Sequence, residues 1–267
     1  MQKAIWQATF FLTISLFAAS NTTQAQPYVT VTDDGFSFNP DPVNIVAGEG
    51  VLWVDDGSGP YTISSSAGYW TPFPTPGGLY FDVPGTYSYY DDAGDFGTVY
   101  VSAHTPPSVT ITNPTNNAVF TAPASFAFAA DTSDPDAVGL SDVEFYVGTN
   151  LVDDVFTSPF ATSVTNLTAG SYTLTAIVYD DLGATGTNSI TISVQITLTA
   201  LNLAAGKFWF NATGLTVGKT NILQDSTNLA SSANWVSIKT NVATSGSASF
   251  TNVVSGRSGF FRLLQLP

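Results

Sequence analysis

The sequence predicts an all-β protein built from tandem β-sandwiches, and three observations support this class. Segments rich in Val, Thr, Ile, Tyr and Phe alternate polar and apolar residues, as in YVTVTD (28–33) and SYTLTAIVY (171–179), which is the period-two pattern of half-buried strands. Clusters of Gly, Pro, Asn and Asp, such as DDGSGP (55–60), separate these segments and favour turns. No stretch shows a convincing amphipathic helix, and strands at this spacing are typical of sandwiches or barrels.

The amino terminus, residues 1–25, is predicted to be a secretory signal peptide. Lys3 precedes an apolar stretch centred on FFLTISLFAAS (10–20), and the stretch ends in a small-residue exit at 23–25, as secretory signals do. A retained membrane anchor is the alternative, but the uninterrupted apolar run is shorter than the roughly 20 residues that a spanning helix needs. We therefore expect a secreted protein, extracellular, periplasmic or on the cell surface, with no integral membrane segment after cleavage.

The remaining chain is predicted to form three modules. It holds roughly 240 residues, more than one compact domain of about 50 to 200 residues usually contains. The segment AHTPP (103–107) is predicted to be a short, stiff linker, because proline fixes φ and lacks a backbone donor. A less marked boundary lies near residues 194–199. The expected modules are therefore residues 27–102, 106–194 and 197–267.

Charge is divided unevenly along the chain, whose formal net charge is −14. No Lys or Arg occurs from residue 26 to residue 206, and every acidic residue except Asp225 lies within that span. Such a surface repels phosphate backbones and anionic lipids, whose binding depends largely on Lys and Arg, so we expect no nucleic-acid partner. The acidity either attracts cations or maintains solubility, and we favour solubility.

The first module carries phrases of a known copper-binding fold. DGFSFNPDPVNIVAGEGVLWV (34–54) and PGTYSYY (84–90), followed by GTVYV (97–101), resemble the cupredoxins, the small Greek-key sandwiches of plastocyanin-like blue-copper proteins. The resemblance covers nearly all of residues 27–102. It implies a cupredoxin-like sandwich for this module.

The copper ligands of that family are absent. Its two His, one Cys and one Met positions hold Tyr61, Asp91, Gly94 and Asp95. A blue-copper site depends on one thiolate and two imidazoles, whereas this chain has no Cys and its lone His104 lies in the linker. Type 1 copper is therefore excluded, although a metal-handling or electron-transfer protein of cupredoxin descent stays the alternative function.

Carboxylates are the remaining candidates for a metal, because hard cations such as Ca²⁺ accept oxygen ligands. The candidates are Asp91, Asp92 and Asp95 in the first module and Asp131, Asp134 and Asp136 in the second. No EF-hand spacing is present, and for both groups we favour the alternative of solvated turn acids. We therefore expect no cofactor, with Ca²⁺ as the alternative.

An aromatic loop, GYWTPFPTPGGLYF (68–81), is the candidate ligand site of the first module. Exposed Tyr69, Trp70 and Phe73 would form a stacking platform for sugars or a contact for a surface protein. The alternative, which we favour, is that the loop folds back and covers the end of the sandwich. The partners expected for such a platform are a polysaccharide or a surface protein.

The second module resembles a bacterial immunoglobulin-like domain, on PPSVTITNPTNNAVF (106–120) and TAGSYTLTAIVYDDLGATGTNSITISV (168–194). The resemblance implies a sandwich used as a spacer or adhesion unit, with Tyr172 placed like the tyrosine corner of that fold. The inward residues predicted from its strands are Phe126, Phe128, Val143, Phe145, Leu174 and Ile177.

The third module resembles a carboxy-terminal β module of exported proteins of the Verrucomicrobia and Planctomycetes type. The phrases that carry this are TNILQDSTNLASSANWVSIKTN (220–241) and the closing GFFRLLQLP (259–267). The resemblance implies no established activity. A surface-retention element and a simple capping domain are the two alternatives.

Most catalytic chemistries lack their residues in this chain. Without Cys, and with one His in a linker, neither Ser-His-Asp nor Cys-His catalysis is available, and His-based zinc sites fail for the same reason. No phosphate-binding glycine loop occurs, whereas a spatial pair of carboxylates for glycoside hydrolysis stays open. We predict a non-enzymatic protein for adhesion or for binding polysaccharide or surface components, with a glycan-active enzyme as the third alternative.

Overall fold

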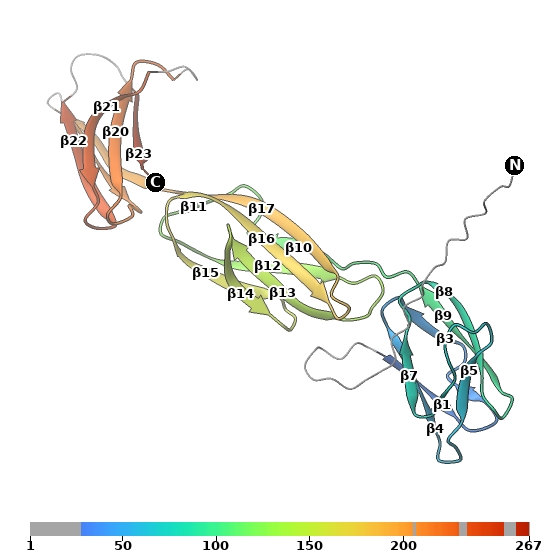
Figure 1. Ribbon diagram of the computed structural model, residues 1–267. Helices are drawn as coiled ribbons and strands as arrows, with labels where there is room; N and C mark the ends of the chain where they lie inside the picture. Colours follow the sequence, from blue (N-terminus) through green and yellow to red (C-terminus); the bar gives the residue numbers. More distant parts are fainter. Residues whose placement is uncertain (1–27, 205–206, 230–233, 254–259, 267) are drawn as a thin grey trace, which may run out of the picture. The chain divides into compact units, whose positions relative to one another are not determined.

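The computed structural model describes residues 28–204, 207–229, 234–253 and 260–266. This part of the chain forms strands and no helix (Figure 1), which confirms the predicted all-β class. Accordingly, none of the described segments is a helix of the length and apolarity that crossing a bilayer requires. The predicted signal peptide, residues 1–25, lies outside the described residues.

The chain divides into two compact units. The first runs to Ser108 and includes residues 133–141 and 179–186, and the second comprises residues 109–132, 142–178 and 187–267. The first unit thus contains the first pair of sheets, the linker and two loop segments of the next sandwich. The boundaries of the three expected modules stay predictions.

The first sandwich consists of a four-stranded sheet in the order β2-β1-β4-β7 and a five-stranded sheet in the order β3-β9-β8-β5-β6. Strands β1 and β4 pair in parallel, as do β3 and β9, whereas β8 pairs antiparallel with β9. The strands are β1 (Tyr28–Asp33), β2 (Phe38–Asn39), β3 (Val43–Val46), β4 (Gly50–Asp55), β5 (Thr62–Ser65), β6 (Phe73–Pro74), β7 (Gly77–Tyr80), β8 (Gly85–Tyr90) and β9 (Phe96–Ser102).

Aromatic rings fill the core of this sandwich. Trp53 on β4 and Tyr89 on β8 are fully buried, and their rings meet edge to face with centroids 5.2 Å apart. Gly97 on β9 lies opposite Tyr89, where a Cβ atom would come within 2.3 Å of the tyrosine Cζ. Glycine at this position therefore leaves the space that the ring of Tyr89 occupies.

The second sandwich pairs a three-stranded sheet in the order β10-β12-β15 with a five-stranded sheet in the order β11-β17-β16-β13-β14. Its two longest strands, β16 and β17, run through the centre of the larger sheet. The strands are β10 (Ser108–Asn113), β11 (Ala118–Thr121), β12 (Ala124–Ser133), β13 (Leu140–Val147), β14 (Asn150–Val155), β15 (Ala161–Leu167), β16 (Gly170–Asp180) and β17 (Thr185–Gln195).

Four of the six inward residues predicted for this sandwich are fully buried: Phe128, Val143, Phe145 and Leu174. Phe126 is partly exposed. The prediction for Ile177 was wrong, since this side chain is partly exposed and the buried row on β16 continues from Leu174 to Ala176 and Val178. Successive side chains of a strand point to opposite faces, so a residue three positions from Leu174 cannot share its face.

Each of these two sandwiches contains a tyrosine that bonds to the backbone four residues upstream. The Tyr172 hydroxyl donates to the Thr168 carbonyl at 2.9 Å, which confirms the predicted tyrosine corner, and the Tyr87 hydroxyl donates to the Val83 carbonyl at 2.8 Å. A glycine precedes each tyrosine by two positions, and a Cβ atom on Gly170 would approach the Tyr172 ring to 3.2 Å. The sequence Gly-x-Tyr therefore marks the same local structure twice.

The last strands form two three-stranded sheets in the orders β18-β19-β22 and β21-β20-β23. Only Ile196 separates β17 from β18, as the weak punctuation of the sequence there indicated. Phe210 and Phe250 stack in the buried core, with ring centroids 5.2 Å apart. The strands are β18 (Thr197–Ala204), β19 (Lys207–Thr213), β20 (Thr220–Ser226), β21 (Val236–Val242), β22 (Ser247–Val253) and β23 (Phe260–Gln265).

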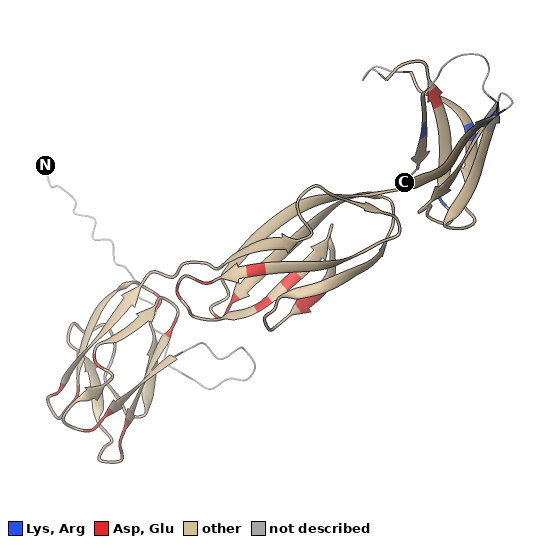
Figure 2. Ribbon diagram, turned by 180° about the vertical axis from the view of Figure 1, so that it is seen from behind, with Lys and Arg blue, Asp and Glu red and all other residues tan. Residues whose placement is uncertain are grey.

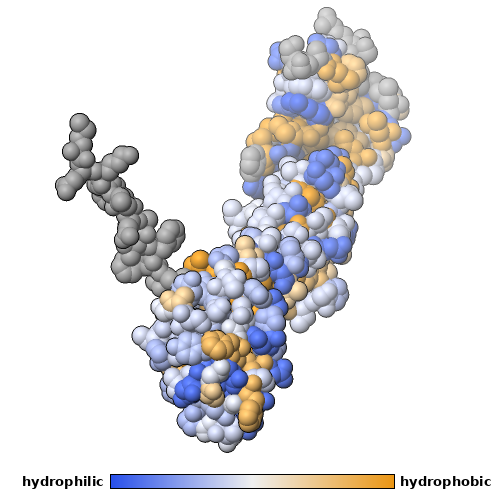
Figure 3. Space-filling model, turned by 90° about the vertical axis from the view of Figure 1, so that its right-hand side faces the viewer, coloured by the Kyte–Doolittle hydropathy of each residue, from blue (hydrophilic) through white to orange (hydrophobic). Residues whose placement is uncertain are grey.

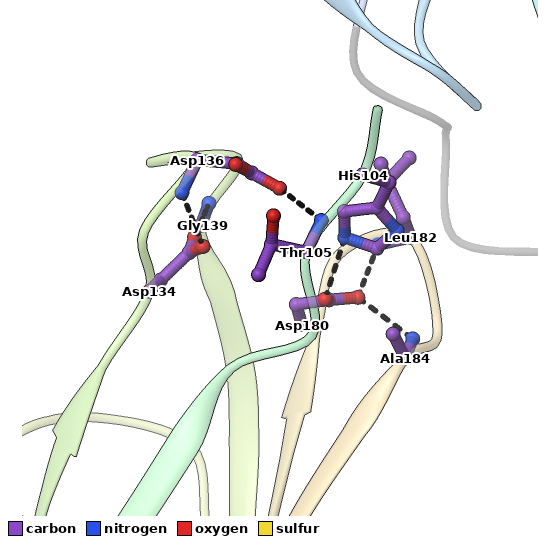
Figure 4. Close-up of polar contacts among 8 residues, drawn as sticks. All are labelled: His104, Thr105, Asp134, Asp136, Gly139, Asp180, Leu182 and Ala184. Carbon is purple, nitrogen blue, oxygen red and sulfur yellow. Dashed lines mark hydrogen bonds and ion pairs between the residues drawn. The ribbon is translucent and has the colours of Figure 1, made fainter. Parts of the chain in front are cut away.

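The linker after β9 is fixed by its histidine (Figure 4). The Nε2 atom of His104 lies 3.0 Å from Oδ2 of Asp180, whose side chain is fully buried at the end of β16. The other oxygen of Asp180 accepts the backbone N–H groups of Leu182 and Ala184 at 3.0 and 2.8 Å. The next linker residue, Thr105, donates its N–H to Asp136. Both oxygens of Asp180 are thus occupied.

We expect His104→Ala to destabilise the fold by roughly 1–3 kcal/mol, because the substitution leaves a buried carboxylate oxygen of Asp180 without a partner. His104→Gln, whose amide nitrogen is a donor on a side chain of similar reach, should recover part of this loss. Denaturant unfolding of the two variants beside the parent measures both effects. Equal stability of His104→Ala and the parent would show that the contact is dispensable.

Candidate functional site

Two loops meet at the end of the first sandwich opposite Ser102, where β9 leads into the linker. They are the β1–β2 loop (34–37) and the β8–β9 loop (91–95), and we call this region the loop end. Figure 2 shows acidic residues gathered in loops at one end of this sandwich. Electrostatic repulsion links four of the loop-end carboxylates, Asp33, Asp34, Asp91 and Asp95. The cluster therefore brings together segments almost 60 residues apart in sequence, from β1 and β8.

Asp33 and Asp91 are buried, with 0 and 2 % of their surface exposed. The Oδ1 atom of Asp33 accepts the N–H of Gly35 at 2.9 Å, and the Oδ1 atom of Asp91 accepts the N–H groups of Gly94 and Asp95, both at 2.7 Å. The Oδ2 atoms of both residues are buried and have no hydrogen-bond partner. Each carboxylate is thus held in place by one oxygen while the other is unsatisfied.

The electrostatic setting of the loop end disfavours the ionised forms of Asp33 and Asp95. Burial, followed by the nearby charges of Asp91, Asp95 and Asp34, raises the pKa of Asp33 to about 6 despite the opposing hydrogen bond from Gly35. Loss of solvent and the charges of Asp91 and Asp34 also raise the pKa of Asp95. Since the chain has no Lys or Arg from residue 26 to residue 206, no cationic side chain of this sandwich offsets the repulsion.

Exposed aromatic rings flank the cluster. Phe36, in the β1–β2 loop, is 86 % exposed, and Phe96, directly after Asp95, is 72 % exposed. The ring of Tyr90 lies across from Phe96, with centroids 5.9 Å apart. Figure 3 shows apolar patches among the hydrophilic surface of the first sandwich. Exposed apolar patches that polar residues surround mark interaction sites.

The acidic candidates of the β8–β9 loop differ in their surroundings. Asp91 and Asp95 join the cluster, whereas Asp92 is exposed and its Oδ1 atom accepts the N–H of Thr62 at 2.9 Å, a bond that lowers the pKa of Asp92. Sequence reasoning missed Asp33. The sequence did contain an indication, because Asp33 lies two residues after the buried Val31 on β1 and therefore on the same, inward face of the strand.

The acidic candidates of the second sandwich shape a loop. Asp134 accepts the N–H of Asp136 with Oδ1 and the N–H of Gly139 with Oδ2, at 3.1 and 3.0 Å, and Asp131 is exposed. Backbone donors thus occupy both oxygens of Asp134 (Figure 4). Among all residues that the structure describes, no group of three His, Cys, Asp or Glu side chains is arranged to hold a metal ion.

The predicted aromatic platform lies mostly in the core. Trp70 and Phe73 are 9 and 7 % exposed, and both rings approach Trp53, with centroids 6.2 and 5.7 Å away. Tyr69 is 46 % exposed and contacts the ring of Tyr87. Two of the three predicted platform rings therefore cover the sandwich, and one lies on the surface.

The positions of the copper ligands provide the wrong donors for type 1 copper. Tyr61, Asp91 and Asp95 offer oxygen, Gly94 offers no side chain, and the only imidazole, His104, pairs with Asp180 in the linker. A donor set of oxygens alone suits hard cations rather than a copper ion that needs sulfur and nitrogen. These residues therefore do not fit the copper of that family.

Comparisons with known proteins find one family match, in the second sandwich, and partial similarities to solved structures. Residues 107–176 match the family described as bacterial Ig domain. Among solved structures, the fibronectin(III)-like modules of Clostridium thermocellum CbhA are 19 % identical over 59 % of this chain and 92 % of that chain, with a TM-score of 0.36. An amicyanin mutant in its reduced Cu(I) form at pH 4 is 21 % identical over 34 % of this chain and 97 % of that chain, with a TM-score of 0.26. No curated protein matches the chain.

The family match confirms the predicted resemblance of the second module to bacterial Ig domains. Such domains are typical of extracellular proteins, and Ig-like folds are typically non-catalytic. The resemblance predicted for the third module, residues 197–267, stays a prediction.

Asp33 should make stability depend on pH in one direction. Its folded-state pKa of about 6 exceeds the ordinary value of 3.8, so the folded chain binds more protons than the unfolded chain between these values, and stability falls as the pH rises through this range. Asp33→Asn keeps an acceptor for the Gly35 N–H and cannot ionise. We expect it to remove this loss, on the order of 1–3 kcal/mol, and to be more stable than the parent at neutral pH.

Denaturant unfolding in chelator, followed from acid to neutral pH, measures the difference between the two chains. The parent and Asp33→Asn should converge at the acid end, where Asp33 is protonated, and diverge at the neutral end. Parallel stability profiles would contradict the assignment of the titration to Asp33.

Proposed function

We propose that this is a secreted, non-enzymatic protein whose first sandwich binds polysaccharide or another surface component through the loop end. The observation that carries the proposal is the placement of exposed Phe36 and Phe96 beside the carboxylates of Asp34 and Asp95. Exposed rings next to hydrogen-bonding groups are typical of surfaces that bind amphipathic ligands.

The chemistry of the loop end favours sugars without negative charge. Aromatic rings stack against the apolar faces of sugar rings, and carboxylate oxygens accept hydrogen bonds from hydroxyl groups. The same carboxylates repel sulfated or uronic acid chains, because no Lys or Arg in residues 26–206 offsets their charge. We therefore expect neutral or amino-sugar polymers to bind in preference to acidic ones.

The burial of the two central carboxylates argues against a glycan-active enzyme at this site. Glycosidases need two carboxyl groups that flank the scissile bond and touch the substrate. The Oδ2 atoms of Asp33 and Asp91 are buried within the sandwich, so a sugar on the surface does not reach them. The Ig-like sandwich that follows serves in this proposal as a spacer of the kind found in extracellular proteins.

Co-sedimentation of the exported chain, residues 26–267, with insoluble cellulose, chitin and xylan tests the proposal. We expect Phe36→Ala and Phe96→Ala each to weaken binding by about tenfold, equivalent to ~1.4 kcal/mol, with stability nearly unchanged because both side chains are exposed. Phe156→Ala, at a 64 % exposed site of the second sandwich, is the matched control and should bind like the parent.

Two results would contradict the proposal. Binding that survives both loop-end substitutions but fails in Tyr69→Ala would move the ligand site to the aromatic loop. Failure of the parent chain to bind any neutral, amino-sugar or acidic polymer would remove polysaccharide as the ligand class.

A further inference from the structure

The buried carboxylates of the loop end lack a counter-charge, which is unusual for groups of this kind. The Oδ2 atoms of Asp33, Asp91 and Asp95 are all buried without a hydrogen-bond partner. Buried polar groups are nearly always paired, and an unpaired buried charge is strongly destabilising. No donor among the described residues pairs with these oxygens, so a group from solution is the candidate partner.

The chain supplies no cationic side chain for this purpose. Residues 26–206 contain neither Lys nor Arg, and His104 is already paired with Asp180. The counter-charge is therefore either a proton or a cation taken from solution. These two alternatives make different predictions, because a proton disappears as the pH rises and a bound cation does not.

The backbone holds the carboxylates in a fixed orientation. The N–H of Gly35 binds Oδ1 of Asp33, and the N–H groups of Gly94 and Asp95 bind Oδ1 of Asp91. In each case the second oxygen is left free and directed away from water. Carboxylates fixed in this way would lose little conformational freedom on binding an ion.

We propose that the loop end contains a binding site for a hard divalent cation of the Ca²⁺ class, with the buried carboxylates of Asp33 and Asp91 as its two side-chain ligands and with Asp95 as a neighbouring charge rather than a third ligand. The donors are all oxygens, which Ca²⁺ prefers, and this ion completes a shell of six to eight ligands with carbonyl groups and water. Two buried carboxylates would supply the negatively charged ligands of such an ion. Metals that prefer sulfur or nitrogen find no ligand there.

The comparison with the other acidic loop explains why the site is assigned here. Backbone donors occupy both oxygens of Asp134, at 3.1 and 3.0 Å, and Asp92 is exposed to solvent. Asp33 and Asp91 combine burial with an unpaired oxygen. The proposal does not depend on glycan binding.

Thermal unfolding and calorimetric titration of the exported chain with CaCl2, each against a chelator control at neutral pH, test the site. We expect a saturable rise in Tm for the parent chain, because an ion that binds only the folded state stabilises it. Asp33→Asn should unfold cooperatively in chelator, show almost no rise, and bind Ca²⁺ roughly tenfold more weakly or worse. Asp95→Asn, which removes a neighbouring charge, should respond less than the parent and more than Asp33→Asn.

Asp82→Asn is the matched control, since it removes one exposed charge of the same sandwich outside the cluster and should respond like the parent. An unchanged Tm of the parent in Ca²⁺ would overturn the proposal. An equal rise in Asp33→Asn and the parent would also overturn it, because the ion would then bind elsewhere.

Discussion

From residue 26 to residue 206 the chain has no Lys, Arg or Cys, and this span holds nearly all of the acidic residues. Ion pairs with Lys or Arg and disulfide bonds are therefore unavailable to the first two sandwiches. Their carboxylates instead accept backbone N–H groups in turns, as Asp34 does from Phe36 and Asp55 from Gly57. A carboxylate–amide hydrogen bond is charge-assisted and stronger than a neutral one, so these acids stabilise the turns in which they lie.

Where backbone donors bind only one oxygen of such a carboxylate, the second oxygen needs another partner. Exposed acids turn it toward water. Among the buried ones, Asp180 bonds His104 with its second oxygen, whereas the second oxygens of Asp33 and Asp91 have no partner. At the linker both oxygens of the buried carboxylate are paired, whereas at the loop end one oxygen of each buried carboxylate is unpaired. An unpaired buried oxygen is a stronger indication of a ligand than acidity alone.

The sequence predicted those features that depend on local periodicity. The all-β class follows from period-two alternation, whereas the tyrosine corner at Tyr172 was predicted from the resemblance of the second module to immunoglobulin-like domains. The predicted face of Ile177 was wrong although the same period rules it out. The inward parity of Asp33 was also visible in β1, but its proximity to Asp91 was not, because it depends on where two loops from different sheets meet.

Composition also could not show which way the rings of the aromatic loop face. A segment rich in Trp, Phe and Pro has the same sequence whether its rings face a ligand or the core. The structure buries Trp70 and Phe73 against Trp53, which three-dimensional packing alone determines. The exposed rings are instead Phe36 and Phe96, single residues beside acidic turns, and their shared location depends on the pairing of distant strands.

The two proposals for the loop end are linked through its loops. Phe36 follows Asp34 in the β1–β2 loop, and Phe96 follows Asp95 in the β8–β9 loop. A cation between Asp33 and Asp91 would tie these two loops together and reduce the repulsion between them, fixing the rings relative to one another. Because coupling between two sites is reciprocal, a ligand that needs both rings in place would tighten cation binding by the same factor by which the cation tightens the ligand.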